Sequence, residues 1–183
     1  MAIVATFELD TAKTVRVSYA KPWYLTVEFT KVKEDGSTQG VGLNRKGFDE
    51  LMNARDAVRQ ALEKEKEMVY RVDGVEVSKH KWITLNYYKD KPCIHLRYWK
   101  VVGASDQGVP TRFGIVLTPG EWERLVSLEE DIRKAIDEGL QNLAEEAKKD
   151  RMARKNQNRK RSAEYFIDDK ATKASKKHWS EEE

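Results

Sequence analysis

The residues best suited to ligand chemistry lie in one alternating segment, 93–99. Apolar and polar side chains alternate there, which predicts a strand with two different faces, and Arg97 and Trp99 fall on the face away from the apolar set. This pairing suits single-stranded nucleic acid, because a base stacks on the ring for about 1–3 kcal/mol and the cation meets a phosphate. The alternative interpretation is that Trp99 only covers a sheet edge or the other half of the chain.

Further cations and a tyrosine surround this pair. Tyr88 to Lys91 forms the turn before the strand, and Arg112 precedes the next apolar strand. The binding face predicted for this half of the chain comprises Tyr88, Lys89, Lys91, Arg97, Trp99, Lys100 and Arg112.

The sequence predicts no enzyme, no metal site and no cofactor. The three histidines (His80, His95 and His178) lack the spacing of metal ligands, and Cys93 is the only cysteine. We find no glycine-rich phosphate loop and no paired-carboxylate motif. No acid or cysteine stands at a telling distance from the histidines, which are expected to be solvated.

The chain contains two copies of one unit, in which short alternating strands precede an amphipathic helix. Strands are expected near 6–9, 15–19, 23–30 and 40–43, and again near 69–77, 83–87, 94–98 and 114–117. The helices are expected to follow Asn44 and Thr118, which are good N-caps, with Phe48 and Trp122 in the core. Strand, cap and helix all repeat at a shift of 74 residues, so duplication is the strongest inference.

The shift in the preceding strands has two interpretations. Lys21-Pro22 matches Lys91-Pro92 at 70, whereas hydrophobic alternation pairs Leu25 with Ile94 at 69. A slip of one residue turns every side chain to the other face. We follow the alternation, because exposing the apolar face of a strand to water is costly. This register predicts a shorter hairpin turn in the first copy. The other register turns Trp23 and Phe29 from the core toward a ligand.

The first copy departs from the binding pattern. The alternation places Glu28 where the second copy has its arginine and Thr30 where it has its tryptophan. The first copy is therefore expected to bind more weakly, through Arg16, Lys21, Tyr24, Lys31, Lys33 and Arg45.

Charge is distributed unevenly along the 183 residues. The net charge is only +3, but residues 148–177 are basic, which favours an acidic polymer as partner. We divide the chain into a first unit at 1–67, a second at 68–150 and a basic, flexible tail at 151–183. The tail is expected to act as a nonspecific nucleic-acid arm or, around Lys155 to Arg161, as a nuclear import signal.

The ordered motifs of the second copy resemble the transcriptional positive cofactor 4 family of single-stranded DNA binders. The motifs are Tyr88-Lys89-Asp90-Lys91, Arg97-Tyr98-Trp99 and Arg112-Phe113-Gly114-Ile115-Val116-Leu117 followed by Trp122. The resemblance covers about 70–136 well and 7–62 moderately. It implies an α+β fold in which each copy is a four-stranded antiparallel sheet followed by one helix. Two copies pair through their helices in that family, so this chain is expected to form an intramolecular pseudo-dimer with a basic C-terminal tail.

Together these observations predict a single-stranded DNA-binding protein of little sequence preference. It is expected to act in transcription, replication or repair, where proteins of transcription or replication are its expected partners. RNA is the alternative ligand, because stacking and phosphate contacts do not read the 2′-hydroxyl. A structural or adaptor protein that kept the fold without the ligand is a third interpretation. No apolar run reaches membrane-spanning length, and a single cysteine fits a reducing compartment. The protein is expected to be intracellular, nuclear if its source is eukaryotic, and monomeric unless its long second helix pairs further.

Overall fold

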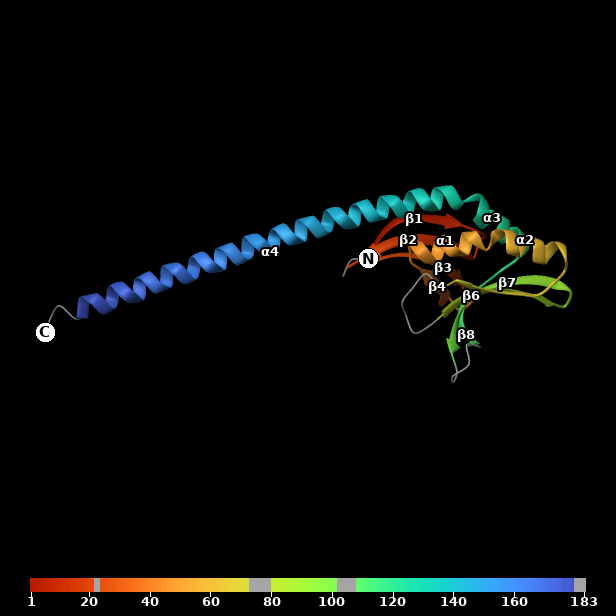
Figure 1. Ribbon diagram of the computed structural model, residues 1–183, viewed down its shortest axis with the longest axis horizontal. Helices are drawn as coiled ribbons and strands as arrows, with labels where there is room; N and C mark the ends of the chain where they lie inside the picture. Colours follow the sequence, from red (N-terminus) through yellow and green to blue (C-terminus); the bar gives the residue numbers. More distant parts are fainter. Residues whose placement is uncertain (22–23, 73–79, 102–107, 180–183) are drawn as a thin grey trace. The chain divides into compact units, whose positions relative to one another are not determined.

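The computed structural model describes residues 1–21, 24–72, 80–101 and 108–179, with side chains described as far as 159 except at 70–72, 80 and 101. The first copy forms an antiparallel sheet in the order β1-β2-β3-β4 (Figure 1). Its elements are β1 (Ala2–Glu8), β2 (Lys13–Ala20), β3 (Tyr24–Val32), β4 (Thr38–Leu43), α1 (Arg45–Asn53) and α2 (Arg55–Glu63).

The second copy repeats this order with a sheet β5-β6-β7-β8. Its elements are β5 (Met68–Val72), β6 (His80–Tyr88), β7 (Lys91–Val101), β8 (Gly108–Leu117), α3 (Pro119–Ser127) and α4 (Glu129–Trp179). Asn44 caps α1 and Thr118 caps α3, as predicted. The α+β fold with two four-stranded antiparallel sheets, each followed by helix, is confirmed. Trp23 and the end of the strand expected over 69–77 lie outside the described residues.

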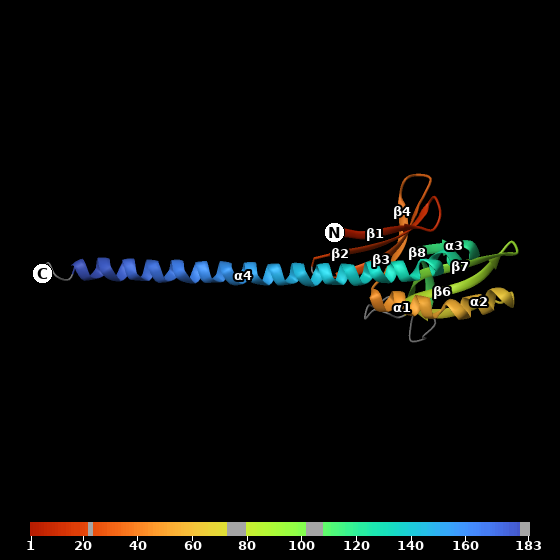
Figure 2. The same ribbon diagram turned by 90° about the horizontal axis from the view of Figure 1, so that it is seen from above.

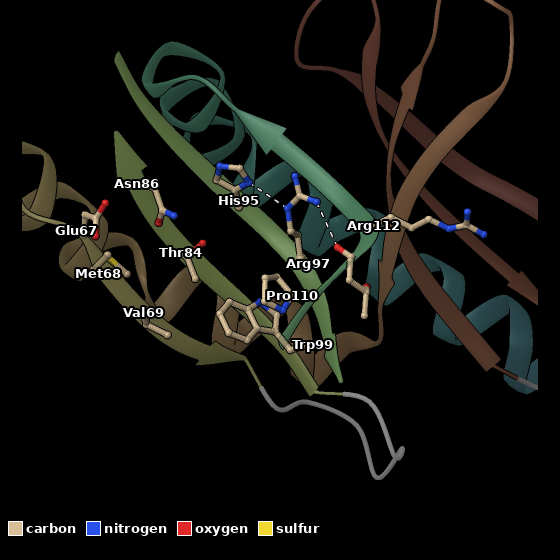
Figure 3. Close-up of a pocket in the computed structure, with 11 residues that line it drawn as sticks. Glu67, Met68, Val69, Thr84, Asn86, His95, Arg97, Trp99, Pro110 and Arg112 are labelled. Carbon is tan, nitrogen blue, oxygen red and sulfur yellow. Dashed lines mark hydrogen bonds between the residues drawn. The ribbon is translucent and has the colours of Figure 1, made fainter. Parts of the chain in front are cut away.

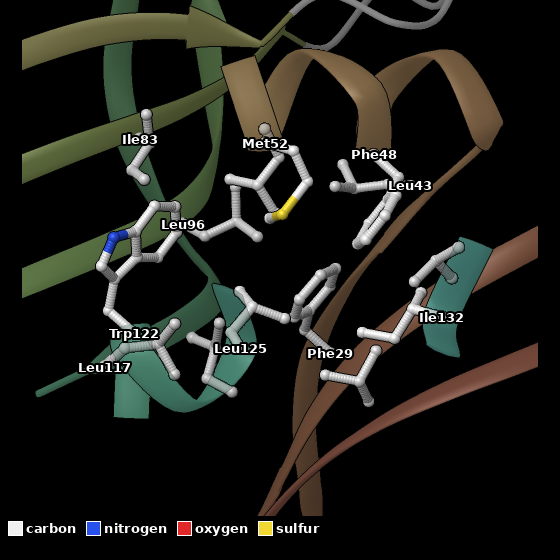
Figure 4. Packing of buried hydrophobic residues seen from close by; sticks show 14 of the residues in the cluster. Phe29, Leu43, Phe48, Met52, Ile83, Leu96, Leu117, Trp122, Leu125 and Ile132 are labelled. Carbon is white, nitrogen blue, oxygen red and sulfur yellow. The ribbon is translucent and has the colours of Figure 1, made fainter. Parts of the chain in front are cut away.

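One hydrophobic core serves both copies (Figure 4). Phe48 and Met52 of α1 belong to the same buried cluster as Trp122 and Leu125 of α3. Phe48 and Trp122 are 0% and 1% exposed, so their assignment to the core is confirmed. Residues 1–143 accordingly form one compact unit, in which the two copies pack as a pseudo-dimer.

Each copy's helix passes from its own sheet to the other sheet (Figure 2). α1 packs on β3 and β4 and also contacts β5 of the second sheet, whereas α2 packs on β6. Likewise α3 packs on β7 and β8, while Gly139 of α4 lies against Leu25 and Val4 of the first sheet. Each helix is broken, at Ala54 and at Leu128, and these positions also correspond at the shift of 74.

The sequence predicted an unbroken helix in each copy, and no glycine or proline marks the breaks. The amides of Ala54 and Leu128 are each shared between the carbonyls three and four residues earlier. Such three-centre bonds tighten one turn toward 3₁₀ geometry, which allows the axis to change direction while the amide keeps its partners.

Strand pairing corrects the shift inferred for the strands before β4 and β8. Phe29 pairs with Val41 and Leu96 pairs with Ile115, and Val41 matches Ile115 at 74. Phe29 therefore corresponds to Leu96, a shift of 67, and the predicted 69 was two residues too large. An even error leaves every side chain on its predicted face. Phe29 is fully buried, as the alternation requires.

The first hairpin has the longer turn, contrary to the prediction. Ala20 pairs with Tyr24 around three residues, whereas Tyr88 pairs with Lys91 around only Lys89 and Asp90. Both turn residues of the second hairpin have positive φ (50° and 59°), as in a type I′ turn. Lys91 thus corresponds to Tyr24, and the match between the two Lys-Pro dipeptides is not structural.

The edge strands β4 and β8 lie side by side where the two copies meet. Gln39 Nε2 donates to the carbonyl of Arg112 at 2.6 Å across this junction. On the helical side, Arg55 pairs with Glu129 at 2.8 Å. Positions 55 and 129 correspond at the shift of 74, so this ion pair joins equivalent positions of the two copies, as contacts in an isologous interface do.

A nearly buried ion pair joins β2 to α3. Lys13 Nζ donates to the two carboxylate oxygens of Glu121 at 2.5 and 2.7 Å, and the two side chains are 11% and 10% exposed. Lys81 corresponds to Lys13 by strand pairing, but Gly47 stands where the second copy has Glu121. The ammonium of Lys81 lies instead 5.1 Å from the centre of the Tyr98 ring, and burial lowers its pKa.

Residues 144–183 lie outside the compact unit of residues 1–143, and their described part, 144–179, is the remainder of α4. The helix continues to Trp179, beyond the first part of the tail for which the sequence indicated helix. None of the described helices is long and apolar enough to span a membrane.

We expect Lys13→Met to lower the free energy of unfolding by about 3 kcal/mol, because it leaves the buried carboxylate of Glu121 without a cation. Urea unfolding measures the effect. Lys46→Met, which removes an exposed partner of Glu50, is the matched control and should change stability by less than about 0.5 kcal/mol. Equal effects of the two substitutions would contradict this account of the pair.

Candidate nucleic-acid interface

A hollow of about 610 Å³ opens on the outer face of the second sheet (Figure 3). Strands β5 to β8 all contribute to its lining, with alternate residues on β6 and β7 and consecutive residues on β5 and β8. The lining residues are Glu67, Met68, Val69, Thr84, Asn86, His95, Arg97, Trp99, Pro110, Thr111 and Arg112. Arg97 and Trp99 therefore share one open cavity, on the face where the alternation placed them.

Trp99 is held in place by a second tryptophan. Its ring stacks on that of Trp82, with centroids 5.2 Å apart and planes inclined by 27°. Trp82 pairs with Arg97 across the β6–β7 ladder, so it lies diagonal to Trp99 on the same face. Both rings are half-buried, and their N–H groups are buried without a partner among the described residues. The Trp99 ring thus presents its aromatic face to the hollow, whereas its indole N–H group is buried.

Two hydrogen bonds orient Arg97 (Figure 3). Its Nε donates to His95 Nδ1 at 3.0 Å, and one terminal nitrogen donates to the carbonyl of Thr111 at 3.3 Å. A guanidinium has five N–H donors, so three are left for a ligand. Because the side chain is already oriented, less conformational freedom is lost when it binds.

His95 must be neutral to accept this bond. Burial, and secondarily the charge of Arg97, lowers the pKa of its imidazole below the ordinary 6.5. Since Nδ1 accepts, the proton of the neutral ring is on Nε2, which makes that nitrogen a donor. The sequence predicted a solvated His95, whereas the side chain is half-buried and accepts a hydrogen bond from Arg97. His95 and Arg97 are two residues apart on one strand and therefore share a face, which is the feature of the sequence that could have indicated this hydrogen bond.

Gly114 makes room for the arginine. It pairs with Arg97 across the β7–β8 ladder and has φ of +156°. A Cβ at this position would lie 2.5 Å from Arg97 Cγ and 2.4 Å from the carbonyl oxygen of Leu96. Any side chain here would displace the β7 backbone or the arginine.

The turn residues lie apart from the hollow. Tyr88 is 68% exposed, and Lys89 Nζ lies 5.5 Å from the centre of its ring. Lys91 and Lys100 are exposed at the two ends of β7, and neither lines the hollow. Arg112 lines its rim, but its guanidinium points away from Arg97 and lies 5.2 Å from the Phe113 ring centre (Figure 3). Of the seven residues predicted for this copy, three line the hollow.

The first sheet carries a corresponding hollow of about 490 Å³ with different chemistry. By strand pairing, Glu28 stands at the position of His95, Thr30 at that of Arg97 and Val32 at that of Trp99. Arg16 lines this hollow too, opposite Glu28 on the neighbouring strand. It combines one cation with one acid and has no aromatic ring from its own strands.

The other candidates of the first copy are scattered. Lys31 and Lys33 line a separate hollow at the β3–β4 turn, and Tyr24 and Arg45 line another beside α1. Arg45 pairs with Asp137 of α4 at 2.9 Å. Lys21 is exposed at the first hairpin turn. The structure does not bring these five residues together with Arg16.

The sequence missed several lining residues of the main hollow, Trp82 behind it, and the bond between His95 and Arg97. Thr84 and Asn86 alternate with buried residues of β6, so their face was predictable, but their neighbours on β7 depend on pairing register. Among the described residues, no group of three His, Cys, Asp or Glu side chains is placed to hold a metal ion. Comparison with protein-family models, curated proteins and solved structures finds no match to this chain.

We expect an NMR titration of His95 to give a pKa below 6.5, and Arg97→Met to raise it by removing the neighbouring charge. Because the folded-state pKa is lowered, the unfolded chain takes up the proton first. This group's contribution to stability is therefore complete above about pH 6.5 and is lost as the pH falls toward the folded pKa. Arg112→Met is the control and should leave the His95 pKa unchanged. An unaltered pKa in Arg97→Met would contradict the pairing.

Proposed function

We propose that the chain binds single-stranded nucleic acid, with DNA as the primary ligand, through the hollow of the second sheet. The observation that supports this most is the face of Trp99, backed by Trp82, beside an oriented Arg97 in a cavity open to solvent. A base that stacks on the ring gains about 1–3 kcal/mol, and the guanidinium can hold the adjoining phosphate with two parallel hydrogen bonds.

The chemistry favours single strands over a duplex. Paired bases stack on each other, so their faces are covered, and only an unpaired base can lie on Trp99. Stacking tolerates any base, which fits a protein of little sequence preference. Such a protein acts where duplexes are opened, in transcription, replication or repair.

RNA is the alternative ligand. Asn86 on β6 is exposed in the hollow, and its amide can donate to or accept from a 2′-hydroxyl, whereas Thr84 on the same strand is only 5% exposed. Competition between oligo-dT and oligo-U of equal length separates the two ligands.

We expect Arg97→Ala with Trp99→Ala to weaken binding of oligo-dT at least tenfold, since one stacking contact and one phosphate contact are lost together. Fluorescence anisotropy across a salt series measures this, and the slope of log K against log salt should become shallower by about 0.7. Thr30→Ala with Val32→Ala changes the corresponding positions of the first hollow and should leave affinity nearly unchanged. Equal affinity of the Arg97/Trp99 variant and the unaltered protein would refute the proposed site.

The difference between the hollows predicts a stoichiometry of one short strand per chain. Native mass spectrometry with an oligo-dT of about six nucleotides should show a 1:1 complex, because Glu28 repels phosphate and Thr30 cannot replace Arg97. A graft of the second copy's residues into the first (Thr14→Trp, Glu28→His, Thr30→Arg and Val32→Trp) should raise the ratio toward two. Two strands bound to the unaltered chain would show that the first hollow also binds.

A further inference from the structure

The part of α4 beyond the compact unit has a regular pattern of charge. Lys148, Arg151, Lys155 and Arg159 follow one another at intervals of three and four residues, which places them on one side of a helix. All four side chains are exposed, and at about 1.5 Å per residue the row is roughly 16 Å long.

The charges on this segment are segregated around the helix. Glu146 and Asp150 fall on the side of the helix opposite the row at 100° per residue, and Lys149 and Arg154 lie between the two sides. Glu145 adjoins the row at its N-terminal end, one turn before Lys148, so the row itself carries only cations from 148 to 159. A solvated helix of mixed charge would alternate signs along each face. This helix instead presents one cationic face, defined by Lys148, Arg151, Lys155 and Arg159.

The composition of the segment favours a nucleic-acid duplex as its partner. Membrane-surface helices need an apolar face, and between 144 and 159 Met152 is the one apolar side chain larger than alanine. A partner protein that buries a helix also needs an apolar stripe. An α-helix with its side chains is about 10–12 Å wide and fits the roughly 12 Å major groove, where both walls carry phosphates.

We propose that the cationic face of α4 binds the phosphate backbone of duplex nucleic acid, as a second site independent of the hollow. The contacts are to phosphates, so they provide affinity without sequence preference. The hollow takes unpaired bases and the helix takes paired strands, so the two sites recognise different forms of nucleic acid.

The test uses the full-length chain and a blunt-ended DNA duplex of about 20 base pairs. Changing Lys148, Arg151, Lys155 and Arg159 together to Gln should weaken duplex binding at least tenfold at about 0.1 M salt. It should also reduce the salt slope by about 3–4, since each lost phosphate contact removes about 0.9. Circular dichroism confirms that the helix is retained, because Gln is a good helix former.

The matched control removes the same charge from exposed lysines of the compact unit, by changing Lys46, Lys64, Lys66 and Lys134 to Gln. This variant should lose less than about threefold in duplex affinity. Equal losses in both variants would show that only net charge matters and would overturn the proposal, as would undiminished duplex binding by the α4 variant. The binding of the unaltered protein and of the α4 variant to vesicles that contain phosphatidylserine is measured as well. If the α4 variant loses vesicle binding but keeps duplex binding, the proposal is overturned and a membrane surface is the partner.

The variant Arg97→Ala/Trp99→Ala separates this proposal from the function assigned to the hollow. It should bind the duplex as tightly as the unaltered protein while its oligo-dT affinity falls. If its duplex affinity falls by a similar factor, the two sites are one and the independent site on α4 is refuted.

Discussion

The shared hydrophobic core is the constraint on which the rest of the structure depends. The inner faces of both sheets are covered by helix segments, and each broken helix covers part of both sheets, so neither copy can bury its apolar face alone. Among the described residues the helix segments lie on the inner faces, and the hollows of the outer faces are open. Polar and aromatic side chains that alternate with the core residues must therefore face solvent or a ligand. The position of a binding surface follows from where the core is, before any particular ligand is considered.

The chemistry of the outer face depends on a few residues that control one arginine. Arg97 lies across Gly114, is held by neutral His95 and by the Thr111 carbonyl, and is next to Trp99 on its own strand. None of these neighbours carries a formal charge when His95 is neutral, and the acid of the lining, Glu67, lies across the hollow on the β5 side (Figure 3). An acid in the position of His95 would have neutralised the guanidinium, and the first copy has such an acid in Glu28.

Much of this arrangement could be predicted from alternation alone, because a period of two fixes which face each strand residue occupies. Arg97 and Trp99 were placed correctly for this reason, and Phe29 was placed in the core even though the shift between copies was two residues too large. What the sequence could not supply was pairing between strands. Trp82 and Trp99 are seventeen positions apart, and their stacking depends on a two-residue turn that contains neither Gly nor Asn. The helix breaks at Ala54 and Leu128 were likewise hidden, since they depend on the sheet that each segment must cover.

The ion pair between Lys13 and Glu121 has a consequence for how such a protein can evolve. In a dimer of identical chains every substitution enters twice, and both symmetry-related positions must tolerate it. In this chain Glu121 has no counterpart, because position 47 is glycine, and Lys81 rests against an aromatic ring instead. Because the two copies lie in one chain, a substitution in one copy does not enter the other. One hollow can therefore specialise while the other copy serves only as a scaffold.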